Sequence, residues 1–228
     1  MITLRRSDDR GHANFGWLDS RHTFSFASYY DPRHMGVSAL RVINDDWVKP
    51  GMGFDTHPHR DMEIISYVLA GSIEHKDTMG FHTVLKAGDI QVMSAGIGIR
   101  HSEYNPSQTE ELNFLQIWIR PNVSGVEPGY QERNFAHSKG ITLVASGYGR
   151  EDSLPINQDA SLYKLNFEQE STRFETVPGK TYYLHIAQGS LVVNGTEMSE
   201  GDGAMITDES LLTLDIEDSV DALLFELP

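Results

Sequence analysis

The stretch "EIISYVLAGSIEHKD", residues 63–77, decides the fold, because it has the composition and the partial alternation of short β-strands. Ala70-Gly71 interrupts it where a turn is expected. Two comparable segments follow, "GDIQVMSAG" at residues 88–96 and "LNFLQIWIRP" at residues 112–121. No long stretch of the chain shows convincing helical periodicity. Many short strands separated by glycine-containing turns predict an all-β fold, an antiparallel sandwich or barrel.

A second set of strands begins with "KTYYLHIAQGSLVVNGTEMSEGDGAMI", residues 180–206, and continues in "LLTLDI" and "DALLFELP". Its turns are spaced like those of the first set, with Gly189 at the position that corresponds to Gly71. This weak internal repeat predicts two antiparallel β-barrels of jelly-roll type in one chain. We place the N-terminal barrel at residues 1–134 and the C-terminal barrel at residues 135–228.

Composition limits the chemistry that the chain can perform. Of its 228 residues, 39% are hydrophobic, which is enough for a packed core, and none is cysteine. The lack of cysteine excludes disulfides, thiolate metal sites and cysteine nucleophiles, so any metal must be held by histidine and carboxylate. No apolar run is long enough for a signal peptide or a membrane-spanning segment, so we expect no membrane contact and a cytoplasmic location.

Charge is distributed unevenly along the chain. Residues 1–150 carry 17 acidic and 15 basic side chains, whereas residues 151–228 carry 16 acidic and 3 basic ones. A surface this acidic repels phosphate backbones, so we expect no direct contact with nucleic acid. The acidic half is interpreted as a solvated surface, and the alternative is a surface that binds a protein partner.

Two pairs of potential metal ligands lie beside turns of the N-terminal half. His57 and His59 stand one residue apart in "DTHPHRDMEI", and His101 and Glu103 do so in "GIRHSEYNP". In a strand, residues i and i+2 project from the same face, and Pro58 favours an extended backbone at this point. Two such pairs on neighbouring strands would give three imidazoles and one carboxylate. That set suits an open site for iron, manganese, cobalt, nickel, copper or zinc.

The ligand pairs have no counterpart in the second half of the repeat. The offset between Gly71 and Gly189 carries His57 and His59 onto Glu175 and Val177. We therefore expect one metal ion in the N-terminal barrel and a structural role for the C-terminal barrel. The other histidines are interpreted as surface or hydrogen-bonded side chains: His12, His22, His34, His75, His82, His137 and His185.

Two longer stretches resemble known motifs of the cupin superfamily. "GMGFDTHPHRDMEIISYVLAG", residues 51–71, matches the first cupin motif, and "GDIQVMSAGIGIRHSEYN", residues 88–105, resembles the second. The second motif is altered, with Ser94 in place of a proline and four residues between Gly96 and His101. In that alteration, and in "RGHANFGWLDSRHTFSFASYYDP" and "MGVSALRVINDD", the chain resembles the pirin family, and the resemblance implies a bicupin.

The resemblance also implies which glutamate is the ligand. Ordinary cupins use the glutamate of the first motif, here Glu63, whereas pirins use that of the His-x-Glu pair, here Glu103. The implied ligands are therefore His57, His59, His101 and Glu103, and we expect iron first among the six metals.

The activity that the resemblance to bacterial pirins implies is that of a quercetin 2,3-dioxygenase. Such an enzyme opens the heterocyclic ring of a flavonol with O₂ and releases carbon monoxide, and Glu103 would accept the substrate's proton as well as bind the metal. The substrate would be a small aromatic molecule, and Phe26, Met52, Phe54 and Met93 are candidates for an apolar mouth, although such residues are more often core.

The resemblance allows a second function from a different class. Some pirins resemble iron-redox-sensing modules that regulate a transcription factor or an enzyme, and the acidic C-terminal half could then contact that partner. Because two barrels in one chain reproduce a cupin dimer, we expect a monomer.

Overall fold

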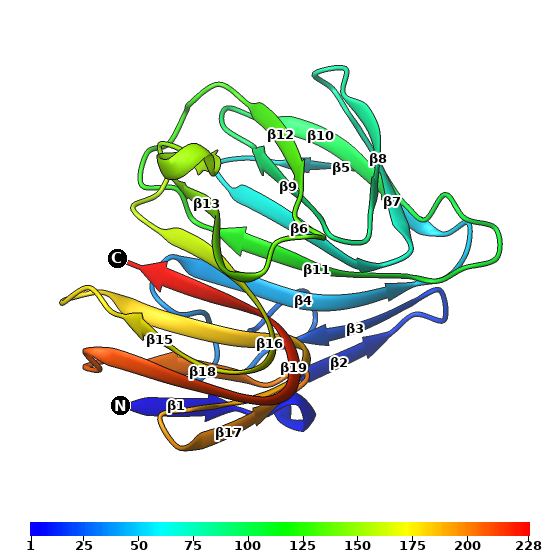
Figure 1. The fold of residues 1–228 in the computed structure, drawn as a ribbon. Helices are drawn as coiled ribbons and strands as arrows, with labels where there is room; N and C mark the ends of the chain where they lie inside the picture. Colours follow the sequence, from blue (N-terminus) through cyan, green and yellow to red (C-terminus); the bar gives the residue numbers. More distant parts are fainter.

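The computed structural model describes residues 1–228 and consists almost wholly of β-strands, arranged in two stacked units (Figure 1). The two helical segments are single 3₁₀ turns, η1 (Ser7–Asp9) and η2 (Arg150–Asp152). No helix is long and apolar enough to cross a membrane. The predicted all-β, two-barrel fold is confirmed, with the refinement that the sheets are jelly-roll-like and do not close completely.

The N-terminal unit contains a seven-stranded and a four-stranded antiparallel sheet. The order in the larger sheet is β12 (Gly129–Asn134), β9 (Asp89–Ser94), β6 (Glu63–Ala70), β11 (Leu112–Ile119), β4 (Leu40–Val48), β3 (Leu18–His22) and β2 (Gly11–Asn14). The order in the smaller sheet is β5 (Gly53–His59), β10 (Ile99–Tyr104), β7 (Ser72–Asp77) and β8 (His82–Lys86).

The C-terminal unit is built on one eight-stranded sheet, which begins with a strand from the other end of the chain. Strand β1 pairs with β18 and so lies beside the last third of the sequence (Figure 1). The division of the chain at residue 134 stays a prediction. The order is β1 (Ile2–Arg5), β18 (Gly203–Ile206), β16 (Thr181–Val193), β19 (Leu211–Leu227), β15 (Ser161–Glu175), β13 (Gly140–Gly147) and β14 (Leu154–Ile156), and β17 (Thr196–Ser199) pairs with β16.

Both faces of the central strands of the seven-stranded sheet are buried, and β6 shows how the sequence achieves this. Ile64, Ser66 and Val68 face the interior of the N-terminal barrel, while Ile65 and Tyr67 belong to a 23-residue core shared with the C-terminal unit. A strand buried on both sides needs a nearly continuous apolar run, and "EIISYVLA" is such a run apart from its polar serine.

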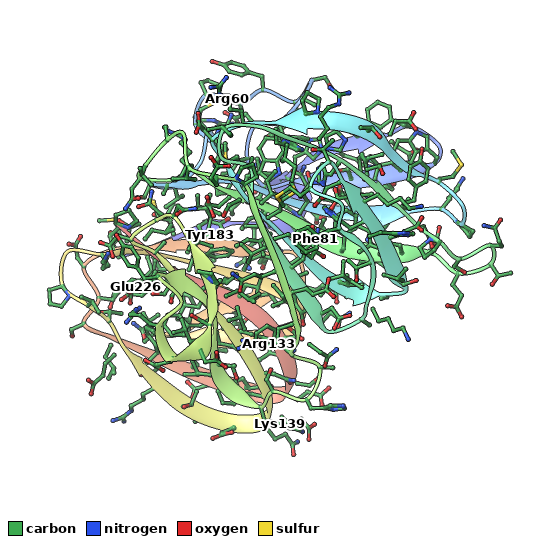
Figure 2. All side chains as sticks on the ribbon, turned by 90° about the horizontal axis from the view of Figure 1, so that it is seen from above. Arg60, Phe81, Arg133, Lys139, Tyr183 and Glu226 are labelled. Atoms are coloured by element: carbon green, nitrogen blue, oxygen red, sulfur yellow. The ribbon has the colours of Figure 1, made fainter.

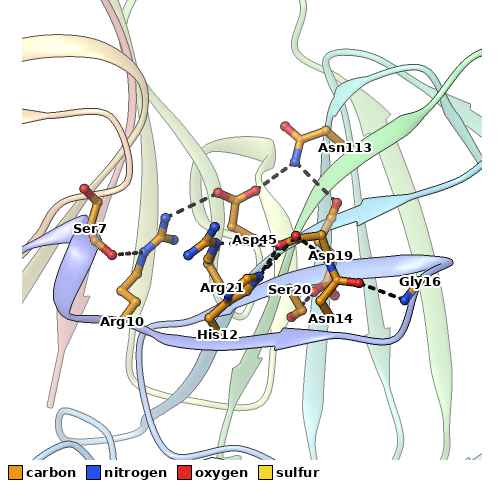
Figure 3. A network of polar contacts seen from close by, with 11 residues as sticks. Ser7, Arg10, His12, Asn14, Gly16, Asp19, Ser20, Arg21, Asp45 and Asn113 are labelled. Atoms are coloured by element: carbon orange, nitrogen blue, oxygen red, sulfur yellow. Dashed lines mark hydrogen bonds and ion pairs between the residues drawn. The ribbon is translucent and has the colours of Figure 1, made fainter.

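Polar contacts join the N-terminal segment to the face of this sheet that packs on the C-terminal unit. Arg10 lies 3.6 Å from the carboxylate of Asp45, which accepts a 2.8 Å hydrogen bond from Asn113 (Figure 3). Tyr183 of the C-terminal sheet lies between the two units, whereas Arg60 and Lys139 lie at opposite ends of the molecule (Figure 2). The two units are therefore joined by a large apolar core with polar contacts beside it.

One cation is buried where the two units meet. The Lys164 ammonium lies 3.3 Å from the Asp221 carboxylate and donates a 3.1 Å hydrogen bond to the Phe135 carbonyl. Tyr67 of the N-terminal unit donates a 2.6 Å hydrogen bond to Asp221 and places its ring under the ammonium, 5.4 Å from the centroid. Only 2% of the lysine side chain is exposed, so its charge depends on these neighbours.

We predict that Lys164→Met destabilises the protein by about 3 kcal/mol, because the Asp221 carboxylate is left without its buried cation. Urea unfolding followed by circular dichroism measures the change. The control is Lys139→Met, which removes an exposed ion pair with Glu168 and should change stability by less than about 1 kcal/mol. Equal effects of the two variants would contradict a stabilising role for the buried pair.

Candidate metal site

Three histidines from two adjacent strands meet inside the N-terminal barrel. His57 and His59 end β5, and His101 on β10 is the direct cross-strand neighbour of His57. The ring centroids lie 4.5 Å apart for His57 and His101, and 4.8 Å apart for each of the other two pairs. One nitrogen from each ring lies within 4.8 Å of the others, so the three imidazoles can converge on one ion.

The hydrogen bonding of these rings fits a metal ion. The Nδ1 atom of His57 lies 2.7 Å from the Asp55 carbonyl oxygen, which can only accept a hydrogen bond. The ring proton is therefore on Nδ1, and the lone pair of Nε2 is free to bind a metal. Both ring nitrogens of His101 are buried without any hydrogen-bond partner. Burial, reinforced by the neighbouring histidines, lowers the pKa of His59 to about 4 and that of His101 to about 3. Both rings are therefore neutral at pH 7, as metal binding requires.

Glu103 lies beside this cluster and is held by three donors of the facing sheet. Its carboxylate accepts hydrogen bonds of 3.2 Å each from Ser66, Gln91 and Gln116. The pairing of β10 with β5 shifts register between His101 and Glu103. In this arrangement a carboxylate oxygen of Glu103 and ring nitrogens of His75 and His101 all lie within 4.8 Å of one another. His101 therefore belongs to two candidate clusters.

The donors to Glu103 belong to a row of polar side chains that crosses five strands. Cross-strand neighbours in an antiparallel sheet point to the same face, and five such neighbours are polar and buried. We call them the polar row: Gln91 on β9, Ser66 on β6, Gln116 on β11, Asn44 on β4 and His22 on β3.

His75 is a neighbour of the site that the sequence analysis did not single out. It is fully buried on β7, opposite Glu103, and its ring centroid lies 5.3 Å from that of His101. Its Nε2 lies 3.0 Å from the Asp77 carboxylate, and its ring stacks on Tyr130. The signal that could have identified it is a third i, i+2 pair of polar residues, His75 and Asp77, in a predicted strand.

Glu63 faces away from the histidines, toward the C-terminal unit. It accepts a 2.6 Å hydrogen bond from Ser94 and a 3.1 Å hydrogen bond from Asn157. It has the same parity along β6 as Ile65, which lies in the core between the units, and the opposite parity to Ser66, which contacts Glu103. The first-motif glutamate thus joins the two units in this protein.

A cavity of about 390 Å³ opens beside His57 and His59. Two of the four candidate mouth residues, Phe26 and Phe54, line it. The other two do not line it: Met52 lies on the surface, and Met93 is fully buried in the core, where such residues are more often found. The aromatic part of the wall consists of Phe15, Trp17, Phe26, Phe54 and Trp118.

Asp46 is a buried carboxyl group in the same cavity wall. Its pKa is raised to about 7, mainly by burial and also by the nearby charges of Asp45 and Glu103, against the lowering effect of a hydrogen bond from the Ser20 hydroxyl. Near neutral pH this side chain therefore exists in both its protonated and its ionised form.

Comparison with known proteins agrees with this architecture. Residues 4–119 match the family model described as Pirin, and residues 143–227 match that described as a quercetinase C-terminal cupin domain. The quercetin 2,3-dioxygenase of Escherichia coli (strain K12) is 48% identical over 229 residues, which cover 100% of this chain and 99% of the relative. A pirin-like protein of Caulobacter vibrioides is 43% identical, with 94% of each chain covered.

Solved structures extend the comparison. The crystal structure of the bacterial pirin YhhW from Escherichia coli, in complex with nickel(II), superimposes with a TM-score of 0.96 at 48% identity and covers 100% of this chain and 99% of that one. The fold and the histidine cluster define a cupin-type protein with two barrels. The chain belongs to the pirin family, which confirms the resemblance seen in its two motifs.

The raised pKa of Asp46 predicts a specific dependence of stability on pH. The folded protein keeps this proton up to about pH 7, whereas the unfolded chain releases it near its usual pKa of 3.8. The folded state therefore binds more protons in that window, and this group's contribution to stability falls as pH rises from about 4 to about 7.

In Asp46→Asn, we expect stability relative to wild type to grow by roughly 4 kcal/mol across that window and then to stay level. Urea unfolding at a series of pH values with a chelator present measures the difference. Ser20→Ala removes the hydrogen bond that lowers the pKa, so the window should extend to higher pH. A difference in stability between Asp46→Asn and wild type that does not change with pH would contradict a raised pKa of Asp46.

Proposed function

We propose that this protein is a metal-dependent flavonol dioxygenase of the quercetin 2,3-dioxygenase type, which opens the heterocyclic ring with O₂ and releases carbon monoxide. The observation that carries the proposal is the aromatic-walled cavity that ends at His57 and His59. Identity of 48% over the full length to a protein named quercetin 2,3-dioxygenase supports it. The cavity volume lies within the range of roughly 300–1,000 Å³ that is usual for small-molecule sites.

We propose that His57, His59, His101 and Glu103 hold one divalent first-row metal ion. The unpartnered nitrogens of buried His101 and the convergence of the three rings support this ligand set. Three imidazoles and one carboxylate suit iron, our first expectation, and also the nickel(II) bound by the Escherichia coli relative. A bound metal ion would supply Lewis acidity that makes a substrate hydroxyl a stronger acid.

The protein's own residues would position the substrate and accept its proton. Trp118 stands edge-on to His59, with ring centroids 5.1 Å apart, and with Phe54 it offers apolar surface to a flat aromatic ring. The Glu103 carboxylate can take the proton of the flavonol hydroxyl, because a carboxylate within reach acts as a general base. Gln91 and Gln116 orient that carboxylate by donating to its two oxygens.

We predict that protein purified without added metal contains about one transition metal ion per chain, and that His57→Ala and Glu103→Ala each lower metal affinity at least about 100-fold. Competition with a chelator and elemental analysis measure this. Glu63→Ala and His75→Ala are the matched controls, and both should retain the metal. Loss of metal in His75→Ala with retention in His57→Ala would place the ion in the other cluster, with His75, His101 and Glu103.

The activity is tested by oxygen-dependent loss of quercetin together with release of carbon monoxide. We expect turnover by the metal-loaded wild type and a decrease of about 100-fold or more in Glu103→Gln, because the proton acceptor is removed. Glu63→Gln, on the opposite face of the sheet, should keep its rate. A metal-loaded wild type that releases no carbon monoxide from any flavonol would contradict the proposal and would favour a regulatory partner of the acidic half.

A further inference from the structure

The polar row is satisfied at one end only. Ser66, Gln91 and Gln116 each donate a hydrogen bond to Glu103. At the other end, the Oδ1 atom of Asn44 and the Nδ1 atom of His22 are buried and have no hydrogen-bond partner. Buried polar atoms without partners are rare in folded proteins, because each has lost its water without a replacement. Neither atom has a hydrogen-bond partner within the chain.

A second polar pair lies next to these residues. Ser20 pairs across the strands with Asp46, as His22 does with Asn44, and all four side chains are at least 97% buried. They form a two-by-two block on β3 and β4, which we call the polar block. All four line the cavity that holds His57 and His59. Only one hydrogen bond joins side chains within the block, from Ser20 to Asp46.

The rest of the cavity determines which ligand can reach the polar block. Trp17 and Phe54 lie edge to face with centroids 5.2 Å apart, and Phe26 and Trp118 do so at 5.4 Å. Such walls favour a flat aromatic ligand. Asp46 and the Asn44 Oδ1 atom accept hydrogen bonds, so the part of the ligand that meets the polar block should carry hydroxyl groups.

We propose that the polar block is the specificity-determining subsite for hydroxyl groups on the ring of the substrate remote from the reacting hydroxyl, so that the enzyme selects polyhydroxylated flavonols. This inference rests on the proposed flavonol dioxygenase function. One edge of the ligand would lie at His57 and His59, and its hydroxylated pendant ring would lie against Asn44 and Asp46. A site built to bind hydroxyls rejects analogues that lack them, because its buried polar groups then stay unpaired.

The test compares flavonols with no, one and two hydroxyl groups on the pendant ring. Binding is measured by quenching of tryptophan fluorescence under nitrogen, where no turnover occurs, since two of the three tryptophans line the cavity. In the wild type, two hydroxyl groups should tighten binding by about tenfold or more relative to none. Asn44→Leu should bring this ratio of affinities close to one. Asp46→Asn should shift the ratio away from its wild-type value.

Asn113→Leu is the matched control, because it makes the same substitution in the same sheet but on the face that contacts Asp45. It should keep the wild-type ratio. A wild-type ratio near one, or a variant Asn44→Leu that weakens all three flavonols equally, would overturn the inference. Should Asn44→Leu not fold, His22→Phe provides the same comparison.

Turnover in air, measured separately, distinguishes the two proposals. If no flavonol is consumed, the proposed function fails, whatever the binding ratios. If flavonols are consumed but the wild type does not discriminate between them, only the subsite assignment fails.

Discussion

The desolvation of a row of polar side chains inside an apolar barrel is the constraint on which the rest of the structure depends. Five strands each bring one polar residue to the same line, and each such group destabilises the fold unless it is paired. Glu103 satisfies three of them at once, so its carboxylate is held where the four-stranded sheet meets the seven-stranded sheet. The position of Glu103 beside His101 is thereby set by the facing sheet as much as by its own strand.

Because side chains alternate along its strands, the seven-stranded sheet has one face for the candidate site and another for packing against the C-terminal unit. One face carries the polar row and looks into the cavity, while the other carries Ile65, Tyr67 and their neighbours in the core shared with the C-terminal unit. Because the C-terminal unit covers that second face, the sheet is supported from behind and the polar row cannot reach solvent through it. The second barrel, which lacks counterparts of His57 and His59, thus has a structural use.

Much of this could be predicted from local sequence. Glycine-punctuated short strands predict the β-fold, and two i, i+2 ligand pairs predict a histidine cluster, since strand geometry alone puts His57 beside His59. The altered motif around His101, together with two N-terminal stretches, indicated the pirin family. His75 and Asp77 form a third i, i+2 pair, but the sequence does not show that His75 is buried beside His101. The polar row has no local signature, because a buried polar residue in a strand alternates as an exposed one does.

The sequence by itself determined the periodicities: which residues alternate, where turns interrupt them, and that His57, His59 and His101 can share a face. Only the tertiary structure decided which face meets which partner. It turned Glu63 toward Asn157 and Glu103 toward Gln116, and it joined β1 to the sheet formed by the last third of the chain. The physical reason is that alternation is a local property of the backbone, whereas the register between distant strands depends on how buried surfaces and hydrogen bonds are satisfied together.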